Sequence, residues 1–419
     1  MATRNRLFSR TLVIPILLSL IVLVHFSKKC VAISNSLNYT KYRHVSSLRL
    51  ARIQSHLDKI NKPPVFTIES PDGDIIDCVR KRKQPALDHP LLKHHKIQRV
   101  PPKMPKAIKS AHRHKGAFGQ MWHQKGELCP KGTVPIRRST VDDVLRAKSL
   151  YDFGKKRARC LTPFDRPMTK HAVALTSAAQ AMYGAKASIG LWDPTVETCG
   201  EFSLSQIWVM LGSFNKPSDL NTIEVGWQVD PQMYGDKRPR FFTYWTRDAY
   251  RSTGCYNLLC SGFVQVNRRI VIGAAFSPVS SIGGNLSEIT ITVWKDPKKG
   301  NWWLALRDIS VGYWPSKLFT HLADQATLVE WGGEIVNAGA NHRHTSTQMG
   351  SGHFAEDGYG KASYFRNLET VDWENNLVPV QGVTTIVEKP KCYNIQSSNN
   401  NEWGTYFYYG GPGRSPQCP

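Results

Sequence analysis

Residues 160–419 of this 419-residue chain are predicted to fold as an all-β sandwich or barrel. Three observations support this prediction. Segments with alternating apolar and polar residues recur along this part, it is rich in Trp, Tyr and Gly, and it contains no convincing long amphipathic helix. Only the short segments 177–184 and 316–326 have helical character. The 260 residues are enough for one large hydrophobic core.

The predicted strands are short and closely spaced, which favours a sandwich or barrel. In chain order they are FSLSQIWVML (202–211), TIEVGWQV (222–229), RFFTYWTR (240–247), GFVQVN (262–267), ITITVWK (289–295), WWLALRD (302–308), TLVEWGGEIV (327–336), YFRNLETVDW (364–373) and GTYFYYGG (404–411).

Two of these strands carry glutamates where a carboxylate has no structural reason to be. The apolar face of 222–229 consists of Ile223, Val225, Trp227 and Val229. Trp227 is therefore expected in the core, and Glu224 lies on the opposite face with Gly226 and Gln228. In 327–336, Glu330, Gly332 and Glu334 share the face opposite Val329, Trp331 and Ile335.

A glycine beside an inward carboxylate leaves room for a close approach to the strand backbone. Two such strands could bring two carboxyl groups together in a cleft, which is the minimum equipment for acid and base catalysis of hydrolysis. The alternative from the residues alone is a pair of structural carboxylates bonded to arginine.

The N-terminus has the pattern of a secretory signal peptide at 1–32: three arginines, an apolar run from Leu12 to about Phe26, and the small-residue site Cys30-Val31-Ala32. The alternative is a type II membrane anchor, but the apolar run is shorter than the ~20 residues of a span. We expect a secreted protein (extracellular or cell wall, with the vacuole as an alternative) that contacts a membrane only through an uncleaved signal.

Positive charge is concentrated in one segment of the chain. Residues 33–159 carry 28 basic and 10 acidic residues, whereas residues 160–419 carry 22 of each. A nucleic-acid binder would need its basic surface in the folded domain, so no nucleic-acid partner is expected. The excess precedes the basic stretch GKKRAR at 154–159. This pattern predicts a propeptide over 33–159 with a processing site near its end; the alternative is a basic linker.

Nine cysteines in an exported chain indicate disulfides. Cys255 and Cys260 enclose a four-residue loop, Cys392 and Cys418 could staple the C-terminal strand, and Cys78 and Cys129 could pair within the pro-segment. Cys160 and Cys199 remain, and the sequence does not fix the connectivity. Asn38 and Asn285 begin N-glycosylation sequons.

Many ordered blocks of the chain resemble the plant neprosin family. In the pro-segment they are DGDIIDCVRKRKQPALDHPLLKHHKIQ and ELCPKGTVPIRR. Later blocks are FSLSQIWV, DLNTIEVGWQV, YGDKRPRFFTYWTRDAYRSTGCYNLLCSGFVQ, VWKDPKKGNWWL, VGYWPSKLF, VEWGGEIVN, TQMGSGHF and WGTYFYYGGPG. The resemblance implies a sandwich of two curved antiparallel sheets and acid-active endoproteolysis on the carboxyl side of proline. It also implies two glutamates, an activation peptide and no metal or other cofactor.

Carried over residue by residue, the resemblance assigns Glu224 as the first catalytic glutamate. The second lies in the EWGGE block, where we favour Glu334 on its spacing from the GCYNLLC block and keep Glu330 in reserve. The family's short disulfides match Cys255–Cys260 and Cys392–Cys418. The implied partners are proline-containing polypeptides as substrates and the chain's own propeptide as inhibitor.

In such a site one carboxylate activates water and one protonated carboxyl acts as acid, and two close carboxyls share a proton at acidic pH. Candidate donors to the oxyanion or the substrate are Gln206, Gln228 and Tyr244. Gln206 and Tyr244 also have purely structural interpretations: Gln206 as a polar residue on a strand face and Tyr244 as a half-buried packing tyrosine.

Other chemistries have weaker support. The chain has no HExxH zinc motif, no GxSxG elbow and no Asp-Thr-Gly or Asp-Ser-Gly signature. His342, His344 and His353 could bind a metal but are interpreted as loop histidines. Two further functions stay open: a glycoside hydrolase, because paired carboxylates on a sandwich also suit that chemistry, and a non-catalytic binding module for cell-wall polymer.

Overall fold

The computed structural model describes residues 42, 44–107, 119–156, 168–176, 180–213, 216–338 and 343–419. The expected signal peptide, Asn38, Cys160, His342 and residues 157–159 of the GKKRAR stretch lie outside these residues. The chain divides into two units, Met1–His56 and Leu57–Pro419. All the strands and the candidate site belong to the second unit.

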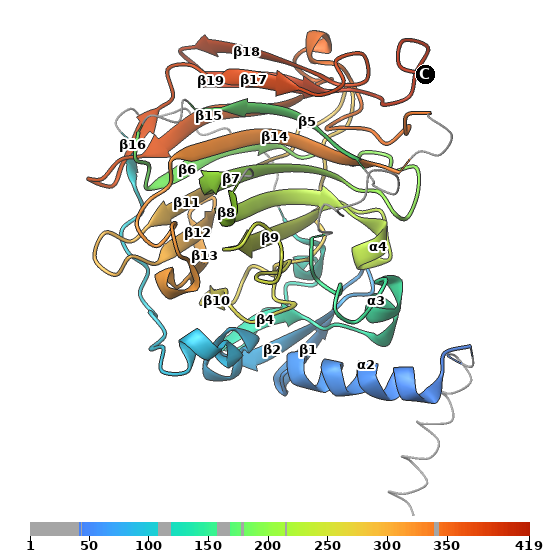
Figure 1. Ribbon diagram of the computed structural model, residues 1–419, viewed down its shortest axis with the longest axis vertical. Coiled ribbons are helices and arrows are strands. Elements are labelled where there is room, and N and C mark those ends of the chain that lie inside the picture. The colour runs from blue at the N-terminus through green and yellow to red at the C-terminus, as the bar shows by residue number, and fades with distance from the viewer. Residues whose placement is uncertain are drawn as a thin grey trace, which may run out of the picture. The chain divides into compact units, whose positions relative to one another are not determined.

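A six-stranded antiparallel sheet carries both predicted glutamate strands. Its order is β17 (Thr384–Val387), β5 (Met168–Leu175), β14 (Leu328–Asn337), β7 (Ser203–Ser213), β8 (Lys216–Val229) and β9 (Arg240–Thr246). Figure 1 shows these strands side by side from β9 to β5. Because β7 lies between β14 and β8, the two glutamate strands are separated by one strand.

A second, ten-stranded sheet completes the fold. Its main path is β10 (Val264–Gln265), β13 (Ile309–Trp314), β12 (Trp302–Leu306), β11 (Glu288–Lys295), β6 (Gly184–Gly190), β15 (Ser363–Val371), β16 (Asn376–Pro379) and β3 (Lys106–Ala107). Strand β19 (Gly404–Gly410) pairs with β15 and with β18 (Asn394–Asn400). All these pairs are antiparallel except β16 with β3.

Apolar side chains of the two sheets form one core. It includes Ile223, Val225 and Trp227 of β8 and Ile289, Ile291 and Val293 of β11, all fully buried. Alternation places these residues on the inner faces and leaves the intervening positions on the outer faces. The all-β sandwich prediction and the core position of Trp227 are therefore confirmed.

Each of the nine predicted strands coincides with an observed one, although β10 is only two residues long. The helical expectations are wrong in the described part. Met182 pairs with Ala326 in an isolated bridge, and 316–326 contains a single 3₁₀ turn. Both segments lie against the sandwich, where tertiary pairing outweighs weak local helix propensity.

The pro-segment forms a small third sheet of β1 (Pro64–Glu69), β2 (Ile75–Arg80) and β4 (Thr133–Arg137). The described α-helices are α2 (Ser47–Ile60), α3 (Val141–Arg146) and α4 (Pro231–Tyr234). The 3₁₀ turns are η1 (Lys81–Lys83), η2 (Pro85–Asp88), η3 (Pro90–Leu92), η4 (Met121–His123), η5 (Ser316–Leu318) and η6 (Ala355–Asp357). Among the described residues, no helix is long and apolar enough to cross a membrane.

Buried contacts join the pro-segment to the sandwich. Trp122 lies in a small core that includes Val271 and Ala274 of the later part of the chain. The fully buried Arg240 donates to Asp74 at 2.5 Å, so the two parts also share a buried ion pair. The pro-segment therefore docks through both apolar and charged contacts.

The structure contains the three disulfides considered from the sequence: Cys78–Cys129, Cys255–Cys260 and Cys392–Cys418. Cys199 is free and exposed. Asn285 is exposed, as a glycosylation site requires.

Candidate active site

The register of the six-stranded sheet places both glutamates on one face. Trp208 of β7 pairs with Glu224 of β8 on one side and with Glu330 of β14 on the other. Glu334 pairs with Leu204, four residues back along β7. Since side chains alternate along a strand, Glu224, Glu330 and Glu334 all point away from the sandwich core.

Two glycines flank these glutamates because neighbouring strands approach closely. A Cβ on Gly226 would lie 1.9 Å from the carbonyl oxygen of Ser205, and one on Gly332 would lie 2.3 Å from that of Ala172. The sequence predicts room for a close approach to the strand backbone at these glycines. In the structure the backbones of the neighbouring strands occupy that room. These positions therefore keep the strands packed and leave no space for a ligand.

A lysine of the pro-segment joins the two predicted catalytic glutamates. Nζ of Lys156 lies 2.9 Å from Oε2 of Glu224 and 3.2 Å from Oε2 of Glu334. These two oxygens are therefore within about 6.1 Å of each other. The carboxylates are 1% and 2% exposed and the lysine 14%. Burial works against the charged ammonium, but Glu224 and Glu334 raise the pKa of Lys156 above its ordinary value.

The backbone around Lys156 is bonded to the same face. The amide of Tyr256 donates to the carbonyl of Gly154 at 2.7 Å, and the amide of Lys156 donates to the hydroxyl of Tyr244 at 3.2 Å. The pro-segment is thus held beside the carboxylates by backbone hydrogen bonds as well as by the side chain of Lys156.

Glu224 is surrounded by neutral donors. The hydroxyls of Tyr250 and Thr222 donate to its Oε1 at 2.6 Å and 3.0 Å, and Nε2 of Gln206 donates to its Oε2 at 3.3 Å. Burial and the charge of Glu224 raise the pKa of Tyr250 well above its ordinary value, so the phenol remains a donor.

Glu334 has a histidine as its cross-strand neighbour. His171 of β5 pairs with Glu334, and its Nε2 lies 3.7 Å from Oε1 of that carboxylate. Nδ1 and the backbone amide of His171 both contact Oε2 of Glu388, at 3.0 Å and 2.9 Å. Burial opposes the imidazolium, but the hydrogen bond to Glu388 and the charge of Glu334 raise the pKa of His171.

Glu330, the reserve candidate, has a different environment. Burial raises the pKa of its carboxyl, and the nearby charges of Glu224 and Glu334 raise it further, whereas His171 lowers it. Lys156 bridges Glu224 to Glu334 and makes no ion pair with Glu330 among the contacts of the described residues.

The three predicted donors take different places. Gln206 contacts Glu224, and its Oε1 is buried without a hydrogen-bond partner in the described structure. Gln228 donates instead to the hydroxyl of Tyr234 at 3.0 Å, away from the carboxylates. Tyr244 pairs with Glu224 across the sheet, and burial raises the pKa of its phenol.

A cavity of about 200 Å³ adjoins the carboxylates. Its apolar lining includes Val173, Trp208, Met210 and Ile386, and its polar lining includes Lys156, His171, Glu330 and Glu334. An aromatic and aliphatic wall beside paired carboxyls can hold an apolar side chain next to a polarised bond.

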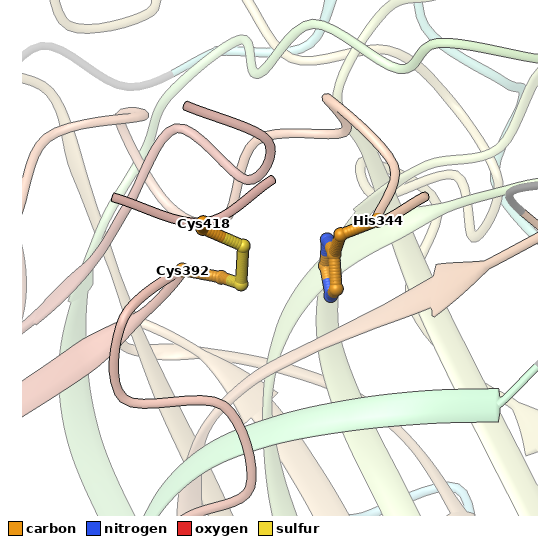
Figure 2. A group of neighbouring side chains, drawn as sticks. All are labelled: His344, Cys392 and Cys418. Carbon is orange, nitrogen blue, oxygen red and sulfur yellow. A yellow bond between two sulfur atoms is a disulfide. The ribbon is translucent and has the colours of Figure 1, made fainter. Parts of the chain in front are cut away.

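The loop histidines do not form a metal site with free ligands in the described part. His344 lies beside Cys392 and Cys418, but these two sulfurs are bonded to each other (Figure 2). A disulfide sulfur is not the thiolate that binds zinc. Nδ1 of His353 contacts Oδ2 of Asp357 at 2.8 Å on the surface.

Sequence reasoning missed several residues of this site: Lys156, His171, Thr222, Tyr250 and Glu388. Thr222 could have been found, since it lies two residues before Glu224 on the same strand face. The others reach the carboxylates from different segments, and no spacing rule connects those segments to Glu224 or Glu334.

Comparison with known families identifies two regions of the chain. The sequence model of the Neprosin domain matches residues 199–412, and that of the Neprosin activation peptide matches residues 67–182. Together they include every described residue of the site.

Similarity to solved structures is weak. Scytalido-glutamic peptidase with a peptide-based transition state analog is 11% identical, with a TM-score of 0.29 over 58% of this chain and 97% of that one. SCP-B, a member of the Eqolisin family of peptidases, in complex with a tripeptide, is 10% identical, with a TM-score of 0.28 over 57% and 96%. A homodimeric agglutinin from chicken liver is 8% identical, with a TM-score of 0.22 over 39% and 93%.

Proposed function

The chain belongs to the neprosin family, and we propose that it is the zymogen of a secreted, acid-active endopeptidase that cleaves on the carboxyl side of proline with Glu224 and Glu334. The observation that carries this proposal is the position of Lys156. A single ammonium contacts both carboxylates, so the two glutamates belong to one site, and that site is filled by the pro-segment.

Hydrolysis begins with one carboxylate ionised and the other protonated. The carboxylate takes a proton from water as the water oxygen attacks the carbonyl carbon, and the carboxyl gives its proton to the carbonyl oxygen. A neutral tetrahedral diol results. Its C–N bond then breaks as the first glutamate protonates the leaving nitrogen and a diol hydroxyl returns a proton to the second. Both glutamates end in their starting states.

Latency follows from the occupied site. Lys156 takes the place between the carboxylates where water and the peptide bond must lie, and it neutralises the charge that would activate the water. At acidic pH the half-buried histidines of the pro-segment become charged, which weakens its docking. The pro-segment then loses its contact with the site, and a water molecule with a shared proton replaces the ammonium.

The donors for the oxyanion come from the same face of the sheet. Nε2 of Gln206 already lies beside Glu224. The phenol of Tyr244, whose oxygen accepts from the backbone amide of Lys156, is uncovered when Lys156 leaves, and its O–H can then donate to the substrate. Both groups are buried, and a donor in a water-poor site stabilises developing charge more strongly than one in water. Gln228 is not proposed for this role because it bonds to Tyr234.

Secretion rests on the predicted signal peptide at 1–32 and on the disulfides, which are typical of oxidising compartments. We expect the mature chain to begin beyond the propeptide and to carry a glycan at Asn285.

One assay separates this function from its two alternatives. The full-length zymogen is expressed, acidified and incubated with proline-containing peptides and, in parallel, with plant glycans. Peptide cleavage after proline supports the proposal, and release of sugar would support a glycoside hydrolase. Retention of the protein on the glycan without release of any product would support a binding module and contradict the peptidase proposal.

A further inference from the structure

The two carboxylates of the site have unequal surroundings. Apart from Lys156, the side chains that donate to Glu224 among the described residues are the neutral Thr222, Tyr250 and Gln206. Glu334 has the ring of His171 beside it. Once Lys156 has left, His171 is the remaining basic side chain in contact with either glutamate among the described residues.

We propose that His171 is a positioning residue that holds Glu334 in its ionised form, so that Glu334 is the general base and Glu224 carries the proton. This inference rests on the proposed function. It goes further by assigning separate roles to the two glutamates and a role to a residue outside the pair.

The fold fixes the imidazole for this purpose. His171 lies directly across from Glu334 in the β5–β14 pair. Glu388 follows β17, and its Oε2 accepts from both the backbone amide and Nδ1 of His171. These two contacts fix the orientation of the imidazole relative to the backbone of β5. With Nδ1 occupied, Nε2 is left facing Oε1 of Glu334 at 3.7 Å, too long for a hydrogen bond but within ion-pair range.

The charges around His171 favour its cationic form. Glu388 and Glu334 face it from two sides, and Glu330 lies on the same strand as Glu334. Lys156 is the cation that opposes its protonation, and it leaves with the pro-segment. The ring of Trp208, with its centroid 6.3 Å from that of His171, adds no charge.

Glu224 suits the protonated role. Its Oε1 accepts from two hydroxyls, as a carbonyl oxygen can. Its Oε2 faces Gln206, whose amide oxygen is buried and lacks a partner. Once Lys156 has left, Oε2 keeps only the 3.3 Å contact from Nε2 of Gln206 among the described residues, so a proton on Oε2 can point toward the substrate.

The test is the acid limb of the pH profile of kcat/KM in the acid-activated enzyme. Replacing His171 by Gln removes the cation beside Glu334, so Glu334 takes up a proton at a higher pH. The value of kcat/KM should then begin to fall at a higher pH than in the parent enzyme. Since an opposite charge within ~4–6 Å lowers a carboxyl pKa by about one unit or more, we expect the limb to move up by about one pH unit. His171→Lys keeps a cation and should keep the limb of the parent.

The matched control is Lys389→Gln, which removes an exposed cation next to Glu388 and should leave the limb in place. If His171→Gln does not fold, His171→Lys still tests the proposal. An acid limb that lies at higher pH in His171→Lys than in the parent overturns it. So does an unchanged limb in a folded His171→Gln enzyme. A fully active Glu224→Gln protein would instead refute the proposed function, so the two failures are distinguishable.

Discussion

Tyr250 donates a 2.6 Å hydrogen bond to Oε1 of Glu224 from a loop whose backbone is in an unusual conformation. Tyr250 and the preceding Ala249 have φ of +64° and +53°, values that side-chain-bearing residues rarely adopt. Asp248 holds the loop by accepting from Thr246 and Thr253. A strained turn that aims a phenol at a buried carboxylate indicates that the contact matters to the site.

We therefore predict that Tyr250→Phe lowers kcat by roughly 10- to 100-fold, because Glu224 becomes charged as it gives its proton to the substrate and a hydrogen bond to a charged group contributes ~1.5–3 kcal/mol. Tyr406→Phe on β19 is the control and should change kcat little. Steady-state kinetics on a proline-containing peptide measure both. An unchanged kcat in folded Tyr250→Phe would show that the phenol serves only the fold.

The glutamate strands illustrate what the sequence can predict. Period-2 alternation placed Glu224 opposite Val225 and Trp227, and the sheet has that arrangement. Such alternation is a property of a single strand, so one segment is enough to reveal it. The same holds for the apolar face of 327–336.

The surroundings of the glutamates were not predictable in this way. That β7 separates the two strands, and that His171 lies across from Glu334, depends on pairing between distant segments. Strands β5 and β6 precede the first predicted strand and were missed, because their small residues give little apolar alternation. The contact of Lys156 depends on how the pro-segment docks, and basic composition alone does not specify which lysine reaches the site.

The catalytic pair is tested by exchanging each carboxyl for an amide of the same shape. Glu224→Gln and Glu334→Gln should each remove most activity, and the double variant should lose little more, because residues acting as a unit are non-additive. Glu330→Gln is the matched control on the same face and should remain active. Chelators and serine or cysteine reagents should have no effect.

The outcome for Glu330 carries its own information. If Glu330→Gln is inactive and Glu334→Gln is active, the second catalytic residue is Glu330 and the contact of Lys156 with Glu334 is incidental. A folded Glu224→Gln protein that cleaves at near the parent rate would exclude the glutamic mechanism.

The disulfides should differ in their contribution to stability. The loop closed by Cys255–Cys260 has a sequence separation of 5, against 26 for Cys392–Cys418 and 51 for Cys78–Cys129. Chain-entropy estimates give about 2 kcal/mol for the first and about 4 kcal/mol for the others. The double Cys→Ser variant of Cys255–Cys260 should therefore lower Tm less than the double variant of either other disulfide. Mass mapping of non-reduced peptides checks the pairing; free thiols at 255 and 260 would contradict it.

Lys156 should set the latency of the zymogen. Lys156→Ala leaves two buried carboxylates without their cation, and breaking a buried pair in this way costs about 3–5 kcal/mol. We expect the uncleaved variant to show activity and to mature faster on acidification. Lys155→Ala is the control, because that side chain lies over the ring of Tyr151 and not at the carboxylates.

Processing is followed by N-terminal sequencing of the acidified samples. The mature fragment should begin between about residues 150 and 175, the region that contains GKKRAR. A start beyond His171 would remove that residue from the active enzyme and overturn the role proposed for it. A full-length parent chain that is already active at neutral pH would show that the pro-segment is not inhibitory.

Three histidines of the pro-segment should make its release depend on pH. Burial lowers the pKa of His89, His95 and His123 below their ordinary value of 6.5, and nearby cations lower each further, while a backbone hydrogen bond with Arg269 partly offsets this for His123. These cations belong to the later part of the chain: Arg247 beside His89, Lys317 and Lys299 beside His95, and Arg269 beside His123. Protonation therefore sets like charges against one another across the docked surface.

The sign of the effect follows from the lowered pKa values. The docked state binds protons less readily than the released state, so docking is strongest above pH ~6.5 and weakens as the pH falls through the docked pKa values. Replacing His89 by Asn and both His95 and His123 by Gln removes these titrations while keeping polar groups. The triple variant should need a lower pH to mature than the parent does.

The midpoint of the activation rate against pH measures this shift. His94→Gln is the matched control, since His94 is exposed on the same segment and should leave the midpoint in place. If the triple variant and the parent mature at the same pH, the half-buried histidines do not govern release.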